Sequence, residues 1–157
     1  MSEMVLISIH PRFVEAILNG EKTIEFRRRW TNRPVGHLVI YATSPVKKIV
    51  ALVPVEEVVE ASPTSLWRLA QQQGGGITRS ELYDYFRERP SGIGLRLGKV
   101  RRLQEAIDPY RCFEGFRPPQ SFRFLVPEEV LALQRARLFS PNRSRKVTTI
   151  QKEHPLD

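Results

Sequence analysis

The chain has 157 residues, of which 41% are hydrophobic and 27% charged, a composition that fits one folded domain and excludes disorder over most of the length. Lys and Arg together number 25 against 17 Asp and Glu, and the formal net charge of +8 favours association with polyanions. The single cysteine excludes an intrachain disulfide, and no run approaches the ~20 apolar residues that a membrane span requires.

The first elements that the pattern predicts are a short strand over residues 5–9 and a helix over residues 11–19. Pro11 suits the first position of a helix, and Gly20 ends it. The apolar face of this helix consists of Val14, Ile17 and Leu18.

Residues 23–30 alternate between apolar and polar side chains, as a half-buried strand does. Ile24, Phe26 and Trp30 fall on one face, where we expect packing for the tryptophan. The opposite face carries Thr23, Glu25, Arg27 and Arg29. The pattern therefore predicts a strand with a charged outer face.

Two further strands are predicted over residues 38–43 and 49–59, with Pro54 marking an edge or a bulge in the second. A helix follows from Ser62 and Pro63, and its core face includes Trp67. The three glycines at 74–76 then predict a flexible break. Thr78 and Glu81 have the spacing of a capping box and indicate a second helix immediately afterwards.

Strand character returns over residues 92–97 and 100–107, and the turn at Gly98 and Lys99 between them predicts a hairpin. Residues 108–120 are loop-like, before a strand over 122–126 and a helix over 128–139. Residues 140–157 lack apolar periodicity, so we expect a mobile basic tail without a role. The alternative is a tail that reaches a polyanion through Arg143, Arg145 and Lys146.

Strands dominate both ends of residues 1–139, with two helices inserted between them, and we see no internal repeat and no second domain. This order suits a small closed or nearly closed sheet better than alternating strand and helix units. We therefore expect one α+β domain over residues 1–139, followed by the tail.

The segment from Lys22 to Arg29 combines charges in a way that suits recognition of a nucleotide. A carboxylate flanked by arginines, as Glu25 is by Arg27 and Arg29, stays ionised and accepts from a base amino group, while guanidinium groups bind phosphate. The alternative is a salt-bridge ladder on a solvated sheet face, worth under ~1 kcal/mol per pair and without function.

The run at residues 20–27, G-E-K-T-I-E-F-R, resembles the G-x-K-x-x-E-x-R signature of ASCH domains, which belong to the PUA-like superfamily. The stretches Y-A-T-S-P at 41–45 and R-P-P-Q-S-F at 117–122 also resemble bacterial and archaeal members, so the resemblance spans roughly residues 4–126. It implies a small PUA-like β-barrel of about five to seven strands with flanking helices. It also implies RNA, or a nucleotide or nucleoside, as the ligand of a basic cleft.

Two further groups are candidates for ligand contacts beside Lys22, Thr23, Glu25, Arg27 and Arg29. Tyr41 and Ser44, together with Thr43, lie at the end of a predicted strand and offer stacking and hydroxyl contacts, although Tyr41 suits the core equally. Gln120 and Ser121 follow two prolines that restrict their loop, and they offer an amide and a hydroxyl to a base edge. A purely structural loop is the alternative.

The resemblance also implies enzymatic alternatives, because some ASCH members are amidohydrolases of N4-acetylcytidine-type nucleosides and others are ribonucleases. The amidohydrolases use a Lys, a Thr three residues later and a Glu, whereas Glu25 holds that Thr position here. Thr23 follows Lys22 directly, so the two side chains would point to opposite faces of a strand. If the protein is an enzyme, we expect Lys22 and Glu25 to move protons around a bound water, with Arg27 stabilising an oxyanion. Binding of RNA or a nucleotide is the leading interpretation.

Metal and cofactor chemistry is not expected, since His10, His37 and His154 are scattered and no second thiol accompanies Cys112. We interpret Cys112 as a packing residue. We expect a soluble cytoplasmic protein without a membrane partner. The sequence leaves its oligomeric state open.

Overall fold

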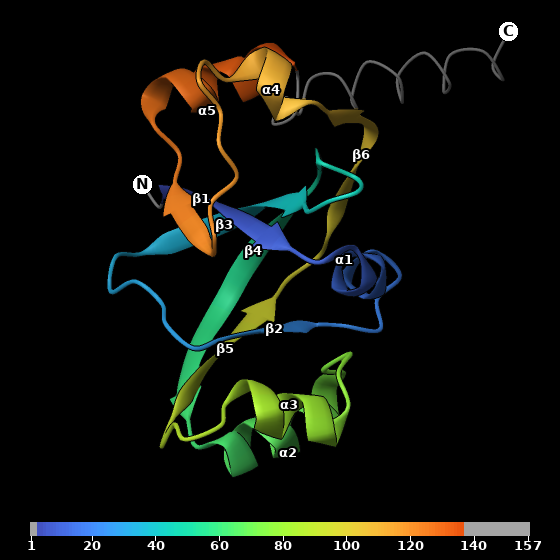
Figure 1. The fold of residues 1–157 in the computed structure, drawn as a ribbon, viewed down its shortest axis with the longest axis vertical. Coiled ribbons are helices and arrows are strands. Elements are labelled where there is room, and N and C mark those ends of the chain that lie inside the picture. Colours follow the sequence, from blue (N-terminus) through green and yellow to red (C-terminus); the bar gives the residue numbers. More distant parts are fainter. Residues whose placement is uncertain (1–2, 137–157) are drawn as a thin grey trace, which may run out of the picture.

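Seven strands and five helices make up residues 3–136, the part of the chain that this computed structural model describes (Figure 1). The strands are β1 (Glu3–Ile9), β2 (Ile24–Arg27), β3 (Val35–Ala42), β4 (Lys48–Ala61), β5 (Gly92–Leu97), β6 (Arg101–Ile107) and β7 (Phe122–Phe124). The helices are α1 (Pro11–Leu18), α2 (Pro63–Gln73), α3 (Arg79–Tyr85), α4 (Pro109–Cys112) and α5 (Pro127–Arg135). The predicted tail over residues 140–157, with its three basic side chains, lies outside the described residues.

The strands form one mixed sheet in the order β2-β5-β4-β3-β1-β7, with β6 also paired to β4. β1 runs parallel to β3, and every other pairing is antiparallel. Together with the helices, this sheet confirms the expected α+β class. Within residues 3–136 the end strands β2 and β7 do not pair with each other, so a closed barrel is not seen. The sheet still bends enough for a side chain of β2 to contact the backbone of β1.

β4 lies between β3 and β5 in the strand order and pairs with each of them over a different half of its length. Its first half pairs with β3 through Lys48–Pro54 and its second half pairs with β5 through Val55–Ala61. The register shifts between Val55 and Glu57, directly after Pro54, which has no N–H to donate to a ladder. The irregularity predicted at Pro54 is therefore confirmed.

The hairpin predicted at Gly98 and Lys99 is wrong, because β5 and β6 do not pair with each other. β5 already has β2 on one side and β4 on the other. The Gly98 N–H donates to the Pro54 carbonyl at 2.8 Å, and the chain then runs along the first half of β4, where β6 pairs. The edges of β5 were occupied, and only tertiary structure could reveal this.

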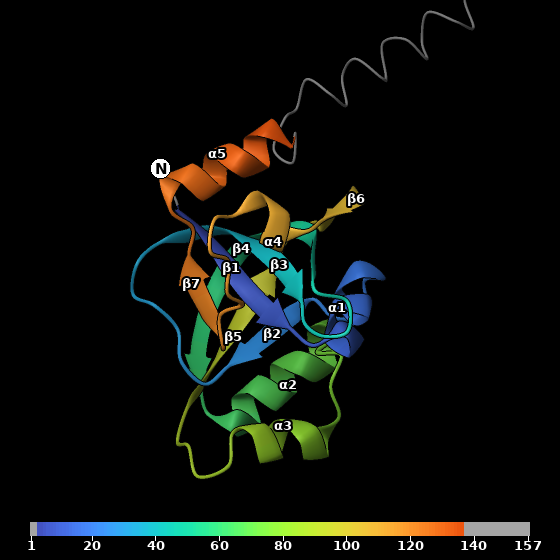
Figure 2. The same cartoon turned by 45° about the horizontal axis from the view of Figure 1, so that its top comes forward.

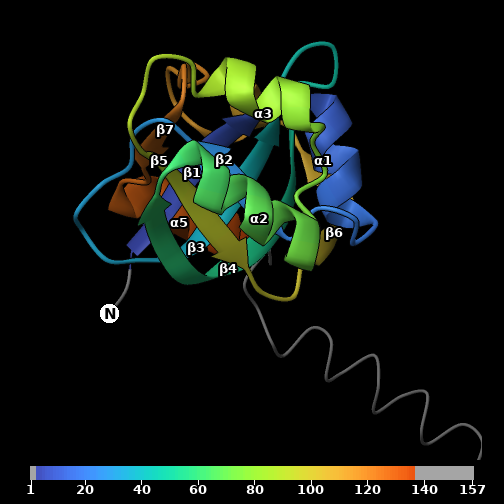
Figure 3. The same ribbon diagram turned by 90° about the horizontal axis from the view of Figure 1, so that it is seen from below.

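Three apolar clusters hold the helices on the sheet, and helices cover its two opposite ends (Figures 2 and 3). The first cluster packs α1 against the sheet through Val14 and Ile17. The second includes Leu133 of α5 and Phe113, which follows α4. The third joins α2 and α3 to β2 and includes Ile24, Phe26, Leu66, Ala70, Leu82 and Phe86.

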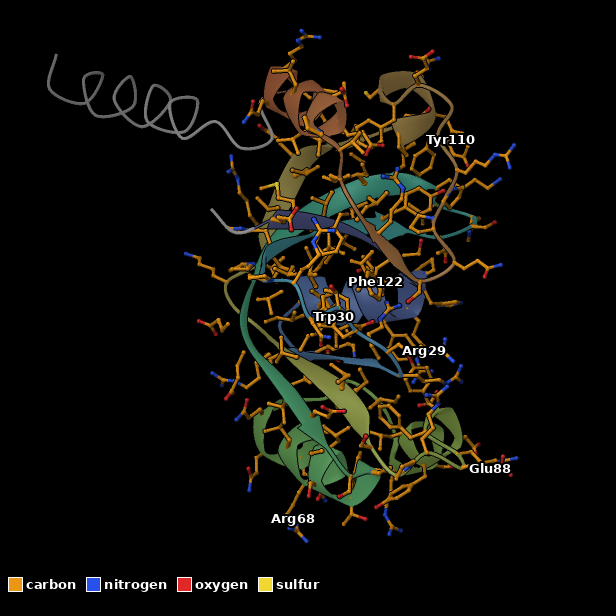
Figure 4. The ribbon with its side chains drawn as sticks, turned by 90° about the vertical axis from the view of Figure 1, so that its left-hand side faces the viewer. Arg29, Trp30, Arg68, Glu88, Tyr110 and Phe122 are labelled. Carbon is orange, nitrogen blue, oxygen red and sulfur yellow. The ribbon has the colours of Figure 1, made fainter. Side chains whose placement is uncertain are left out.

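Two sequence interpretations of single side chains have different outcomes. Trp30 packs on Phe122 with ring centroids 4.4 Å apart, as expected of a packing residue (Figure 4). Cys112 is exposed, so its interpretation as a packing residue is wrong. The short helix α4 buries Pro109 instead and places the thiol on its outer side.

Among the described residues, no helix combines the length and apolar character needed to span a membrane.

Candidate functional site

Lys22 is buried beneath a turn of three glycines that follows α2. Its Nζ donates to the Gly75 carbonyl at 2.8 Å and lies 3.5 Å from Glu25 Oε1. The rings of Phe13 and Phe26 flank the ammonium, with centroids 5.1 and 5.0 Å from Nζ. Burial lowers the pKa of Lys22 below its ordinary value, and Glu25 opposes this effect only in part.

Glu25 and Arg27 form a buried ion pair on one face of β2. Nε and Nη2 of Arg27 donate to Glu25 Oε2 at 3.1 and 2.8 Å. Only 6% of Glu25 and 9% of Arg27 is exposed, so the predicted charged outer face of this strand is wrong. Alternation correctly separated these side chains from Ile24 and Phe26, but the polar face looks into the molecule, toward β1. A solvated salt-bridge ladder is thereby excluded for this pair.

Arg27 also connects β2 to the proline-rich segment before β7. Its Nη2 donates to the Ser8 carbonyl at 2.9 Å, and its Nη1 donates to Ser121 Oγ at 3.2 Å. Ser8 in turn fixes that segment, since its N–H donates to the Ser121 carbonyl and its hydroxyl donates to the Pro119 carbonyl. Ser121 is exposed, so the buried ion pair ends at a hydroxyl that faces solvent.

The structure thus brings together four of the residues predicted from sequence. Lys22, Glu25, Arg27 and Ser121 form one continuous chain of polar contacts. We call this set the Arg27 cluster. It combines two cations, one carboxylate and one hydroxyl, and none of its members is a histidine.

Other predicted site residues lie apart from the Arg27 cluster. The Thr23 hydroxyl donates to the backbone carbonyls of Gln73 and Gly74, which makes it part of the contact between β2 and α2. Arg29 is exposed at the surface (Figure 4). Gln120 is exposed beside Ser121, and Ser44 is exposed in the turn after β3.

Tyr41 occupies the core position that the sequence allowed as its alternative. It is 1% exposed, and its ring packs on Phe116 with centroids 5.4 Å apart. Burial raises the pKa of the Tyr41 phenol to about 12, with Tyr110 contributing. Figure 4 shows Tyr110, a residue of α4, at the end of the molecule opposite Arg68 of α2.

Several contributors to the site were not identified from sequence. Phe13 of α1 covers Lys22, Ser8 of β1 holds Arg27, and the Gly75 carbonyl binds the ammonium. The run of three glycines was the only local signal among them, because a run without side chains permits close backbone approach. Within residues 3–136, no group of three or more His, Cys, Asp or Glu side chains is placed to hold a metal ion.

Comparisons with known proteins point to one family. The family model of the ASCH domain matches residues 7–109. The "ASCH domain-containing ribonuclease" of Zymomonas mobilis is 31% identical over 131 residues, which cover 82% of this chain and 88% of that protein. The crystal structure of ASCH from Zymomonas mobilis has a TM-score of 0.77 at 29% identity, covering 84% of this chain and 94% of that chain. The N-terminal domain of Staphylothermus marinus McrB, at 12% identity and a TM-score of 0.52, shares the fold alone.

Proposed function

This chain belongs to the ASCH domain family, with its PUA-like fold, and on that basis we propose that it binds RNA or a nucleotide at the Arg27 cluster. The observation that carries the proposal is the buried Glu25–Arg27 pair, which reaches solvent through Ser121. Burying two charges costs several kcal/mol per ion, and an exposed pair would avoid that cost. We therefore interpret the buried charges of Glu25 and Arg27 as groups held in place to bind a ligand.

The Arg27 cluster offers groups that match a nucleotide. The Glu25 carboxylate has its two oxygens directed by Lys22 and Arg27, and it retains capacity to accept from a base amino group. The Ser121 hydroxyl, which accepts from Arg27, can donate to a base or a ribose. The proposal keeps Thr23, Arg29, Ser44 and Gln120 as flanking candidates, of which Thr23 and Gln120 adjoin Lys22 and Ser121 in sequence. Tyr41, which is buried in the core, is not kept.

Affinity in this proposal comes largely from the charge of the whole protein. The formal net charge of +8 attracts phosphates, so binding is expected to weaken steeply as salt rises. The cluster would instead supply the contacts that orient a base, since its charges are partly neutralised by one another.

Fluorescence anisotropy with a short mixed RNA at low and moderate salt tests this function. We expect salt-sensitive binding that Glu25→Gln weakens by about tenfold, because the neutral amide cannot hold Arg27 or accept as strongly. Glu129→Gln is the matched control, since Glu129 forms a bidentate pair with Arg123 at 2.7 Å between β7 and α5. Equal binding by wild type and Glu25→Gln would contradict a role for the cluster.

A second candidate function is RNA cleavage, which the name of the 31% identical Zymomonas protein favours. Here the lowered pKa of Lys22 would let the amine act as a base, with Arg27 stabilising a phosphoryl oxyanion. The same samples, analysed for cleaved RNA and for deacetylation of N4-acetylcytidine, separate binding from the two hydrolytic activities. Turnover that falls by ~100-fold or more in Lys22→Ala would make the protein a hydrolase.

A further inference from the structure

An exposed arginine that lies over a tyrosine ring follows Arg27 in sequence. Arg28 follows Arg27 in sequence, but it contacts α3, whereas Arg27 contacts β1. The centre of the Arg28 guanidinium is 4.4 Å from the centroid of the Tyr85 ring, and its Nε donates to the Tyr85 carbonyl at 2.8 Å. Two contacts from one residue therefore hold an exposed guanidinium over one ring.

Tyr85 holds this arginine and also packs on the third apolar cluster. It is half-buried at the end of α3, where it also packs on Phe86 at 4.9 Å. Burial raises the pKa of the Tyr85 phenol, and the charge of Arg27 opposes this effect in part. A ring that is anchored in the apolar cluster of α2 and α3 therefore supports Arg28.

We propose that the exposed face of the Arg28 guanidinium is a stacking platform for a nucleobase of single-stranded RNA, adjacent to the nucleotide at the Arg27 cluster. This inference rests on the proposed function. A guanidinium is planar and weakly hydrated, so it stacks on aromatic rings on both of its faces. Tyr85 lies on one side of the Arg28 guanidinium, and in this proposal the base meets its exposed side.

The chemistry of the platform selects the ligand class. Bases in a duplex are already stacked on their neighbours, whereas bases of a single strand can be splayed onto a protein surface. Arg29, exposed and next in sequence, carries a positive charge suited to the phosphate between two such nucleotides. The ligand is thus expected to be single-stranded RNA of at least two nucleotides.

Short single-stranded RNAs with 2-aminopurine at successive positions provide the test, because stacking on the protein changes the fluorescence of this base analogue. We expect one position to respond on binding to the wild type. Arg28→Lys keeps the charge and removes the plane, so it should lose that response and weaken binding about tenfold with an unchanged salt dependence. Arg68→Lys on α2 is the control and should match the wild type, because it exchanges another exposed arginine that lies away from Arg29, the neighbour of Arg28 (Figure 4).

The outcomes separate this inference from the proposed function. If the wild type binds RNA, but Arg28→Lys binds equally and gives the same 2-aminopurine response, the platform is refuted and RNA binding stands. Failure of the wild type to bind RNA overturns both. A merely structural role for Arg28 would lower the melting temperature of Arg28→Lys without changing the response, and that result also refutes the platform.

Discussion

The Arg27 guanidinium reaches from β2 to β1, where it donates to the Ser8 backbone carbonyl at 2.9 Å. The two residues belong to β2 and β1, which do not pair in the strand order. A charged side chain thus makes the connection that a ladder of backbone hydrogen bonds would make in a closed barrel. Since the same guanidinium holds Glu25 and Ser121, one residue contributes both to the contact between these strands and to the geometry of the site.

Replacing Arg27 should therefore destabilise the protein strongly. Arg27→Met leaves the Glu25 carboxylate buried without its main partner, and we expect a loss of about 3–5 kcal/mol in urea unfolding. Adding Glu25→Gln should recover part of this loss, because it removes the unpaired charge. Arg33→Met, which breaks the exposed pair with Glu3, is the control and should cost no more than about 1 kcal/mol. Similar losses in both single variants would contradict our account of Arg27.

The buried ammonium of Lys22 should make stability rise with pH. Its pKa in the folded protein lies below the ordinary value of 10.5, so the unfolded chain binds this proton more tightly than the folded protein does. Between the folded pKa and 10.5, rising pH removes the proton that burial disfavours, and the free energy of unfolding increases. Denaturant unfolding at a series of pH values should show this gain in the wild type relative to Lys22→Met. Parallel pH profiles for the two proteins would refute it.

Tyr41 should have the opposite effect at alkaline pH. Its pKa rises from 10.0 to about 12 in the folded protein, so the unfolded chain loses the phenolic proton first. The contribution to stability is complete below pH 10 and disappears as the pH rises toward 12. Tyr41→Phe lacks this group, and its alkaline unfolding midpoint should lie at a higher pH than that of the wild type. An unchanged or lower midpoint would contradict the prediction.

The glycine turn over Lys22 should tolerate no side chain. Gly76 has φ +63°, and an added Cβ would lie 2.6 Å from Lys22 Cβ, so Gly76→Ala should cost about 2–4 kcal/mol in unfolding. Gly115 has φ +61° but no heavy atom within 4 Å of such a Cβ. Gly115→Ala therefore isolates the backbone cost and should lose only about 1 kcal/mol. If both variants lose the same amount, contact with Lys22 is not what requires glycine.

Local signals in the sequence predicted most helix and strand positions correctly. Pro11 begins α1 and Gly20 ends it with φ +87°, as their backbone preferences require. Thr78 and Glu81 form the predicted capping box at the start of α3. These features depend on residues a few positions apart, which a single sequence displays directly.

The errors concern what meets an element from elsewhere in the chain. Alternation placed Glu25 and Arg27 on one face of β2 but could not show that this face meets β1 instead of solvent. Tyr85 fits its helix as an ordinary apolar position, and its contact with Arg28 exists only because α3 packs beside the end of β2. Side-chain periodicity carries no information about such distant partners.

The shared strand β4 has a consequence for how the protein can come apart. One half of β4 pairs with β3, which leads to β1 and β7, and the other half pairs with β5, which carries β2. In the described sheet, β4 therefore connects the group of β3, β1 and β7 to the group of β5 and β2. Neither group can detach and remain folded without giving up half of that strand. The protein should therefore lose its structure in one cooperative step, and amide protons in the middle of β4 should exchange with solvent only when the whole domain opens. A ligand bound at the Arg27 cluster would slow that exchange throughout the domain, far from the place where it binds.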